Sequence, residues 1–313
     1  MSVAINIQPN PDKPMVGVIA GATATGKSAV AIDVARELGG TIINADASQV
    51  YADLRILSAR PSDADMAAVP HRLYGCVDGA NACSAADWAF LARAEIDVAL
   101  EAGRVPLLVG GTGLYLRTLL DGIAPVPEID ADVRAKVRSL DPDAANAALE
   151  REDPAAAARL ERADRQRTLR ALEVVRSTGR TLADWQGERT GGIAATHAVV
   201  AIVVERDRAE LRDRCSARVG AMLAAGALDE VAALVRRNLD TDSPIMRAIG
   251  VPQLSAVLDN SMTLAAAESA IIHATRRYAK RQATWFRNQT PDWHRYEPGL
   301  TNLNGKVSDF FTA

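Results

Sequence analysis

The chain has 313 residues, of which 48% are hydrophobic and 24% charged, and its formal net charge at pH 7 is −3. This length allows one or two domains with a sizeable core. The weak negative charge excludes a global basic field for nucleic acid, so any such binding must come from local patches.

Targeting and redox features are sparse. The three cysteines, Cys76, Cys83 and Cys215, have no C-x-x-C spacing, which argues against a disulfide framework or a zinc site and suits a reducing compartment. No apolar run reaches the roughly 18 residues of a membrane span. Residues 1–13 lack the order of a signal peptide and predict a loose tail. We therefore expect a cytoplasmic protein without membrane contact, and no obligate protein partner is evident.

The first motif fits the phosphate-binding pattern G-x-x-x-x-G-K-[ST] and consists of Gly21, Ala22, Thr23, Ala24, Thr25, Gly26, Lys27 and Ser28. An apolar run at 15–20 predicts a buried strand before it, and residues 28–38 predict a helix after it. The two glycines permit consecutive N–H groups to point into one hollow, and the helix N-terminus adds roughly half a positive charge. Lys27 supplies a mobile charge for phosphate oxygens, and Ser28 supplies a hydroxyl for Mg²⁺. This phosphate loop predicts a polyphosphate site without naming the ester.

The next segment, 41–51, begins as a strand and ends in polar residues. Ligands of open α/β sheets lie at the carboxyl ends of the strands, so Asp46 is expected near the phosphate loop. Its position is compatible with a partner of a Mg²⁺ shell, a helix cap or a general base.

Residues 61–81 are rich in turn formers and predict a loop. Ser84 then predicts the N-cap of a helix that runs through Leu100.

A second glycine turn, residues 110–113, follows the apolar run 105–109 and precedes a predicted helix at 114–120. Its glycines would let the backbone approach a ligand closely. Thr112 is the one side chain of this turn that can form a hydrogen bond. A tight turn that serves packing alone is the alternative.

The composition changes after Gly122. Residues 130–186 are rich in Ala, Arg and Glu and predict helices, and the next strand candidate is 197–204. The simplest topology is an α/β protein whose parallel sheet core, residues 1–124 and 196–313, is interrupted by a helical insertion at 125–195.

Two segments carry concentrated positive charge. Arg167 and Arg170 lie three apart on one predicted helix face, which on pattern alone favours a solvated face. Further helices are predicted at 209–225, 228–237 and 264–285, and residues 273–287 have five positive charges and no negative one. Such a basic stripe attracts phosphate-rich ligands. Residues 290–313 predict a weakly ordered tail.

Three polyphosphate chemistries fit the phosphate loop: phosphoryl transfer by a small-molecule kinase, nucleotide hydrolysis by a switch, and alkyl transfer with diphosphate as leaving group. An N-K-x-D motif is absent, which disfavours a GTPase switch. The loop alone does not separate the kinase from the alkyl transferase. A non-catalytic RNA-binding protein with a relic loop is a further alternative.

The motifs in their order resemble the bacterial tRNA isopentenyltransferase (tRNA dimethylallyltransferase) family. The matching pieces are GATATGKS (21–28), DASQVY (46–51), PHRLYG (70–75), SAADW (84–88), VPLLVGGTGLYL (105–116), VR (133–134), QRTLR (166–170) and ATRRYAKRQATWFR (274–287). The resemblance implies a P-loop NTPase-like core with a helical insertion that contacts the tRNA anticodon stem-loop. It also implies transfer of the dimethylallyl group from dimethylallyl diphosphate to N6 of the adenosine 3′-adjacent to the anticodon (position 37).

The resemblance also implies residue roles. The phosphate loop with Mg²⁺ holds diphosphate, Asp46 is the general base for the adenine amine, and Thr112 positions the acceptor base. The residues that match tRNA contacts are Asp46, Ala47, Ser48, Gln49, Thr112, Arg134, Gln166, Arg167, Thr168, Leu169 and Arg170. The chain departs from the family pattern at Ala22, Thr25, Ala47, Arg60 and Val251. None of these changes removes the loop or Asp46.

Overall fold

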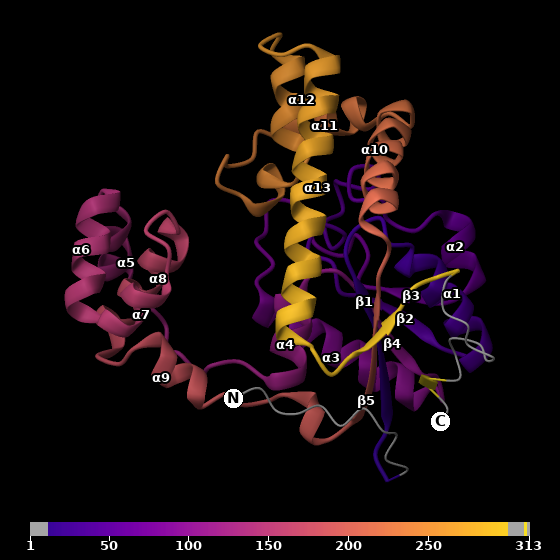
Figure 1. Ribbon diagram of the computed structural model, residues 1–313, viewed down its shortest axis with the longest axis horizontal. Coiled ribbons are helices and arrows are strands. Elements are labelled where there is room, and N and C mark those ends of the chain that lie inside the picture. Colours follow the sequence, from indigo (N-terminus) through magenta and orange to yellow (C-terminus); the bar gives the residue numbers. More distant parts are fainter. Residues whose placement is uncertain (1–11, 300–309, 312–313) are drawn as a thin grey trace. The chain divides into compact units, whose positions relative to one another are not determined.

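In a computed structural model of the chain, the structure describes residues 12–299 and 310–311. Two compact units are distinguished by their internal contacts (Figure 1). One unit is Asp121–Gly192, where composition predicted an insertion at 125–195. The other unit contains the described residues on both sides of it and is called the core unit here.

The core unit is built on a parallel sheet. Its strands are β1 (Met15–Gly21), β2 (Thr41–Asn44), β3 (His71–Arg72), β4 (Pro106–Gly110), β5 (Ala198–Val204) and β6 (His294–Tyr296). Their order is β3-β2-β4-β1-β5-β6, and every neighbouring pair within the described chain is parallel (Figure 1). The α/β prediction is therefore confirmed. The first turns after β1, β2 and β4 meet at the carboxyl edge of the sheet, which is where ligands bind in open α/β folds.

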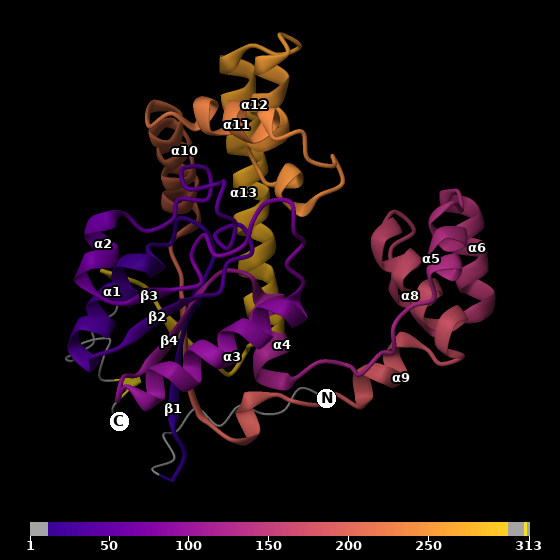
Figure 2. The same ribbon diagram turned by 180° about the vertical axis from the view of Figure 1, so that it is seen from behind.

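Both faces of the sheet are covered, which explains why its strands are apolar runs without alternation. On one face, Ile19 and Ile202 pack with α1 (Lys27–Leu38). On the other face, Val18 and Val203 belong to the main core, with α3 (Ala85–Glu101), α4 (Gly113–Asp121) and α13 (Leu264–Gln289). Figure 2 shows α3 and α4 on the near side of the strands.

A group of helices follows β5. They are α10 (Arg208–Ala224), α11 (Ala227–Arg236), the 3₁₀ turn η2 (Pro244–Arg247), α12 (Val251–Leu258) and α13. Both α10 and α12 pack against α13, and α11 packs against α12 (Figure 1). The prediction included α10, α11 and α13 but missed α12.

Two predicted irregular segments contain regular structure. Residues 61–81 include α2 (Asp63–Ala68), which begins with a capping box between Ser62 and Asp65, and strand β3. The expected weakly ordered tail contains β6, and Phe311 is only 1% exposed. The Phe311 ring packs on Gly17, where a Cβ atom would lie 2.9 Å from it. Those two predictions were wrong for these residues, whereas residues 1–11, 300–309 and 312–313 of the predicted tails lie outside the described chain.

The helical unit has its own core. It contains α5 (Ala131–Arg138), α6 (Pro142–Glu152), α7 (Pro154–Arg159), α8 (Arg165–Thr178) and α9 (Leu182–Gly187). Aspartates cap the first four helices, as their side chains accept hydrogen bonds from first-turn N–H groups. Val137, Leu149 and Leu172 pack at the centre with several alanines. Across both units, none of the helices formed by described residues is long and apolar enough to span a bilayer.

Candidate active site

The phosphate loop connects β1 to α1 as predicted. Gly26 has φ 93°, a conformation that suits glycine, and α1 begins at the next residue. Ala24 also has a positive φ of 66°, so the loop holds one residue with a side chain in the left-handed region. The hydroxyl of Thr25 donates to the carbonyl of Ala22 at 2.9 Å and closes the loop on itself.

One backbone amide of the loop donates its hydrogen bond to another part of the protein. The backbone N–H of Thr23 donates to the side-chain oxygen Oε1 of Gln282 at 2.8 Å. The sequence predicts a row of N–H groups pointing into one hollow. The structure assigns the Thr23 amide to a side chain of α13 instead.

Lys27 is the cation of the loop. Its ammonium lies 3.4 Å from the carbonyl oxygen of Ala22. Burial lowers the pKa of Lys27 to about 8; the carboxylate of Asp46 opposes this shift, and the guanidinium of Arg218 adds to it. With this pKa Lys27 is still mostly protonated near neutral pH, and an anion in the loop would favour the charged form further.

Asp46 follows β2 and is held by its neighbours. Its backbone N–H donates to Oδ1 of Asn44 at 2.9 Å, and its own Oδ1 accepts the N–H of Ser48 at 2.9 Å. The Asn44 side chain is fully buried and also donates to the carbonyl of Leu73. The carboxylate is therefore fixed at the end of β2, next to the phosphate loop as predicted; its chemical role is not tested by this placement.

Thr112 and Gln49 form bonds inside the protein. The Thr112 hydroxyl oxygen accepts the N–H of Ala47 at 2.9 Å, which ties the glycine turn to the segment after β2. The Gln49 amide donates to the carbonyls of Ser58 and Ala59 at 3.0 and 2.9 Å. Both side chains therefore brace the walls of the site, and these bonds do not test the predicted contacts with substrate.

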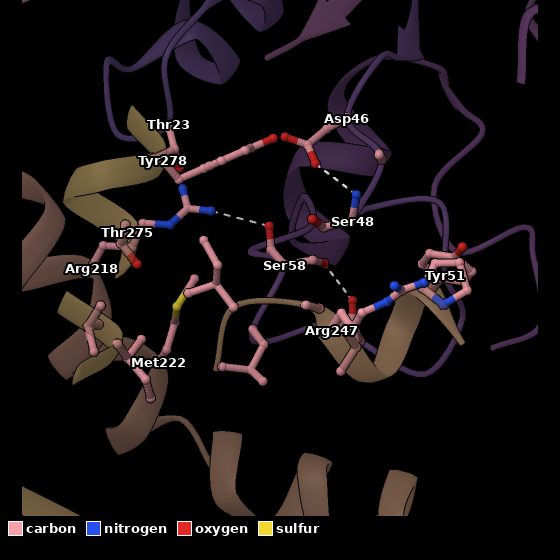
Figure 3. A pocket seen from close by; sticks show the side chains of 18 of the residues that line it. Thr23, Asp46, Ser48, Tyr51, Ser58, Arg218, Met222, Arg247, Thr275 and Tyr278 are labelled. Atoms are coloured by element: carbon pink, nitrogen blue, oxygen red, sulfur yellow. Dashed lines mark hydrogen bonds between the residues drawn. The ribbon is translucent and has the colours of Figure 1, made fainter. Parts of the chain in front are cut away.

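A cavity of about 340 Å³ joins these elements (Figure 3). The phosphate loop contributes Thr23 to its lining, and the segment after β2 contributes Asp46 and Ser48. Figure 3 shows the Asp46 carboxylate and the Tyr278 phenol directed toward one another. The apolar part of the lining comes from Leu54, Leu57, Val219, Met222, Ile249 and Ile271. One partly open pocket therefore contacts the phosphate loop, a carboxylate and an apolar wall.

Several lining residues were missed by the sequence analysis. Arg218 of α10 donates to the carbonyl of Ser58 at 3.2 Å, and burial lowers its pKa. Tyr278 of α13 lies over the cavity, and burial together with the Asp46 charge raises its pKa. Tyr115 of α4 stacks on Trp88 with ring centroids 4.7 Å apart. Arg218 stands in an ordinary amphipathic helix without a local motif, whereas Tyr115 falls inside the motif at 105–116 but was given no role. Tyr278 falls inside the basic segment 273–287, for which only the charges were considered.

The remaining predicted residues lie in the helical unit. Arg167 is exposed and pairs with Asp164 at 2.8 Å, whereas Arg170 lies 3.7 Å from the buried carboxylate of Glu173. Gln166 is exposed as well. Thr168 is only 2% exposed, and Leu169 packs on the core of the unit. The side chains of Gln166, Arg167 and Arg170 are thus the accessible part of this segment. Arg134 on α5 is partly exposed, and its buried Nε has no hydrogen-bond partner.

A cation at the phosphate loop would rely on few protein ligands. Among the described residues, His, Cys, Asp and Glu form no group of three or more with the spacing of a metal site. Ser28 is exposed at the start of α1, which leaves its hydroxyl accessible. This arrangement fits Mg²⁺, which binds few protein groups and retains phosphate and water ligands.

Comparison with known proteins places the chain in a family. A family model described as IPP transferase matches residues 49–289, and a second, described as Isopentenyl transferase, matches residues 14–81. The tRNA dimethylallyltransferase of Sphingopyxis alaskensis is 59% identical over 91% of this chain and 94% of its own length. That of Erythrobacter litoralis is 54% identical over 91% and 92% of the two chains.

Solved structures agree in fold. The full-length tRNA isopentenylpyrophosphate transferase of Bacillus halodurans has a TM-score of 0.66 and 32% identity, covering 91% of this chain and 90% of its own. A eukaryotic dimethylallyltransferase acting on tRNA has a TM-score of 0.81 and 25% identity, covering 96% and 78%. The fold is thus P-loop NTPase-like, and the chain belongs to the IPP transferase family, together with the tRNA dimethylallyltransferases.

Proposed function

We propose that this protein transfers the dimethylallyl group of dimethylallyl diphosphate to N6 of the adenosine 3′-adjacent to the anticodon of a tRNA. Family membership supports the reaction. The observation that carries it is a cavity whose lining combines Thr23 of the phosphate loop, the Asp46 carboxylate and apolar side chains. A leaving group, a proton acceptor and an apolar transferred group can thus meet in one volume.

The reaction joins two changes at one carbon. The bond between N6 of adenine and C1 of the allyl group forms, and the bond from C1 to the diphosphate oxygen breaks. The proton of the amine goes to Asp46, and diphosphate leaves into the phosphate loop. The adenine amine is a weak nucleophile because its lone pair is delocalised, so a fixed carboxylate within reach of its proton lowers the barrier.

The phosphate loop stabilises the growing charge. Lys27 and the N-terminus of α1 supply positive charge to the departing diphosphate, and Arg218 adds a guanidinium from the cavity wall. Mg²⁺ held at the Ser28 hydroxyl would neutralise further charge on the diphosphate. The apolar wall, together with the bound acceptor base, would keep water away from the reactive allyl carbon.

The acceptor base must leave its stack to enter such a cavity, which costs a few kcal/mol. Contacts to the RNA backbone and loop repay this cost. The exposed Gln166, Arg167 and Arg170 with Arg134 are the contacts we assign to the helical unit, and Ala47, Ser48 and Gln49 those of the core unit. In this arrangement Thr112 acts on the acceptor base through Ala47, whose N–H it holds.

The test is mass analysis of nucleosides from unmodified tRNA incubated with the protein, dimethylallyl diphosphate and Mg²⁺. The expected product is N6-isopentenyladenosine at the position next to the anticodon. ATP consumption with a small metabolite and no RNA would instead identify a kinase. RNA binding without any modified nucleoside would identify a non-catalytic binding protein.

A further inference from the structure

Gln282 connects three segments that are far apart in the chain. It lies on α13 and is 4% exposed. Its Oε1 accepts the Thr23 N–H at 2.8 Å, and its Nε2 donates to the carbonyl of Gly111 at 2.9 Å. One carboxamide therefore bridges the phosphate loop and the glycine turn.

The glycine turn is shaped to receive this amide. A Cβ atom on Gly111 would lie 2.1 Å from Nε2 of Gln282 and 2.9 Å from the carbonyl oxygen of Gly21. A Cβ atom on Gly113 would lie 2.3 Å from the Trp285 ring. The turn therefore packs directly against Gln282 and Trp285 of α13, and this close contact requires glycine at both positions.

Near neutral pH a carboxamide completes both bonds. It presents one acceptor and one donor, whereas a carboxylate can accept but cannot donate, and an apolar side chain does neither. Because the site is buried, an unmatched Thr23 N–H or Gly111 carbonyl would be left without water. The orientation of Thr23, a cavity-lining residue, thus depends on Gln282.

We propose that Gln282 is a positioning residue for the transfer reaction. Its carboxamide fixes the first half of the phosphate loop against the glycine turn, so that the remaining amides and Lys27 converge on the departing diphosphate. The same helix contributes Tyr278 and Arg281 to the cavity, and the ring of Tyr278 lies 5.5 Å from the Arg281 guanidinium. The role in transfer rests on the function proposed above, whereas the role in diphosphate binding does not.

The experiment compares Gln282→Glu and Gln282→Met with Gln289→Glu and Gln289→Met. Gln289 is a matched control because it lies on the same helix, is exposed and accepts one hydrogen bond from Arg117. Three quantities are measured for each: affinity for inorganic diphosphate by calorimetry, single-turnover rate, and affinity for tRNA.

Gln282→Glu removes the bond to Gly111 and is expected to lose about tenfold in diphosphate affinity and in single-turnover rate. Gln282→Met removes both bonds and is expected to lose at least as much. The tRNA affinity of both variants stays within about twofold of the parent. Gln282→Glu regains diphosphate affinity, relative to the parent, as the pH falls toward the pKa of the introduced carboxyl group, because the protonated acid donates again to Gly111. Gln282→Met shows no such recovery.

Unchanged diphosphate affinity in both Gln282 variants would overturn the proposal. An equal loss of tRNA affinity and thermal stability without the pH recovery would also overturn it, since that pattern describes a purely structural side chain. If the parent and the Gln289 variants bind diphosphate but transfer no prenyl group, the proposed function fails while the diphosphate measurements still test Gln282.

Discussion

The hydroxyl oxygen of Thr112 accepts a hydrogen bond from the backbone N–H of Ala47 at 2.9 Å. Through this bond the glycine turn after β4 holds the segment that carries Asp46. Thr112→Val removes the acceptor and leaves a partly buried N–H without a partner. We expect kcat to fall on the order of tenfold, whereas Thr112→Ser retains the hydroxyl and stays near the parent. Steady-state prenyl transfer to tRNA measures both, and a Ser variant as slow as the Val variant would contradict the role of this bond.

The variant Asp46→Asn removes the proposed proton acceptor but keeps the hydrogen bond that orders the turn. The amide oxygen of Asn can still accept the Ser48 N–H, so the turn after β2 is preserved. The proton acceptor is removed, and we expect single-turnover prenyl transfer to fall by about 10²- to 10⁴-fold. Binding of tRNA should stay at the parental level. A single-turnover rate close to that of the parent would exclude Asp46 as the general base.

The lowered pKa of Lys27, about 8, predicts a pH dependence of diphosphate binding. The anion prefers the charged lysine, so affinity should fall as the pH rises through the pKa, by up to about tenfold per pH unit above it. Lys27→Arg keeps its charge over this range and should flatten the curve. Calorimetry gives the affinity of the parent and of Lys27→Arg for inorganic diphosphate at each pH. Diphosphate changes its own protonation in the same way for both proteins, so this effect cancels when the two curves are compared. Parallel curves would show that Lys27 does not titrate in this range.

The same pKa shift makes the stability of the folded protein depend on pH. Lys27 binds its proton less tightly in the folded protein than in the unfolded chain, whose value is 10.5. Between about 8 and 10.5 the unfolded chain therefore holds more protons, and the contribution of Lys27 to stability rises with pH in that window. Urea unfolding of the parent and Lys27→Met across this window measures the difference.

Arg167 and Arg170 are expected to bind tRNA phosphates. Replacing either with Ala should weaken tRNA binding and reduce the slope of log affinity against log salt concentration by roughly 0.7 to 0.9 for each phosphate that the protein no longer neutralises. Arg176→Ala is the control, because Arg176 lies on the same helix and is paired with Glu152 at 2.7 Å. Filter binding over a range of salt concentrations gives the slopes. Slopes equal to that of the control would remove both residues from the interface.

A substitution at Phe311 tests whether this C-terminal side chain packs in the core. Its ring is 1% exposed and packs in the layer between the sheet and α1. Phe311→Ala should lower the free energy of unfolding by about 3 to 5 kcal/mol. Phe90→Ala, at a residue 73% exposed on α3, should change it by less than about 0.5 kcal/mol. Equal effects in chemical denaturation would contradict the packing of Phe311.

Most of the sheet was predictable because its longer strands are recognisable from their own amino-acid sequence. The apolar runs that became β1, β4 and β5 are bounded by glycine or polar turns, and burial on both faces makes them continuous. By contrast, β6 contains His294, Arg295 and Tyr296 and has no apolar run. It becomes a strand because it pairs with the open edge of β5, which is a tertiary effect. Helix α12 was missed since it is short and has a proline in its first turn.

The site was predictable only in part for the same reason. The phosphate loop and Asp46 follow strands directly, so a motif and a topological rule locate them. Gln282 reaches Thr23 across 259 residues, and Arg218 reaches Ser58 across 160. Arg218 lies in no quoted motif, and the motif at 274–287 contains Gln282 without indicating what its side chain contacts. Their positions depend on how α10 and α13 pack on the core.

The position of β1 between β4 and β5 has a consequence for biosynthesis. The phosphate loop is translated early, yet the strand on one flank of β1 follows almost two hundred residues later, and the Thr23 amide gains its partner only with α13. A polypeptide still attached to the ribosome before that point therefore lacks a finished binding hollow. The geometry of the loop therefore depends on segments that are translated long after the loop itself.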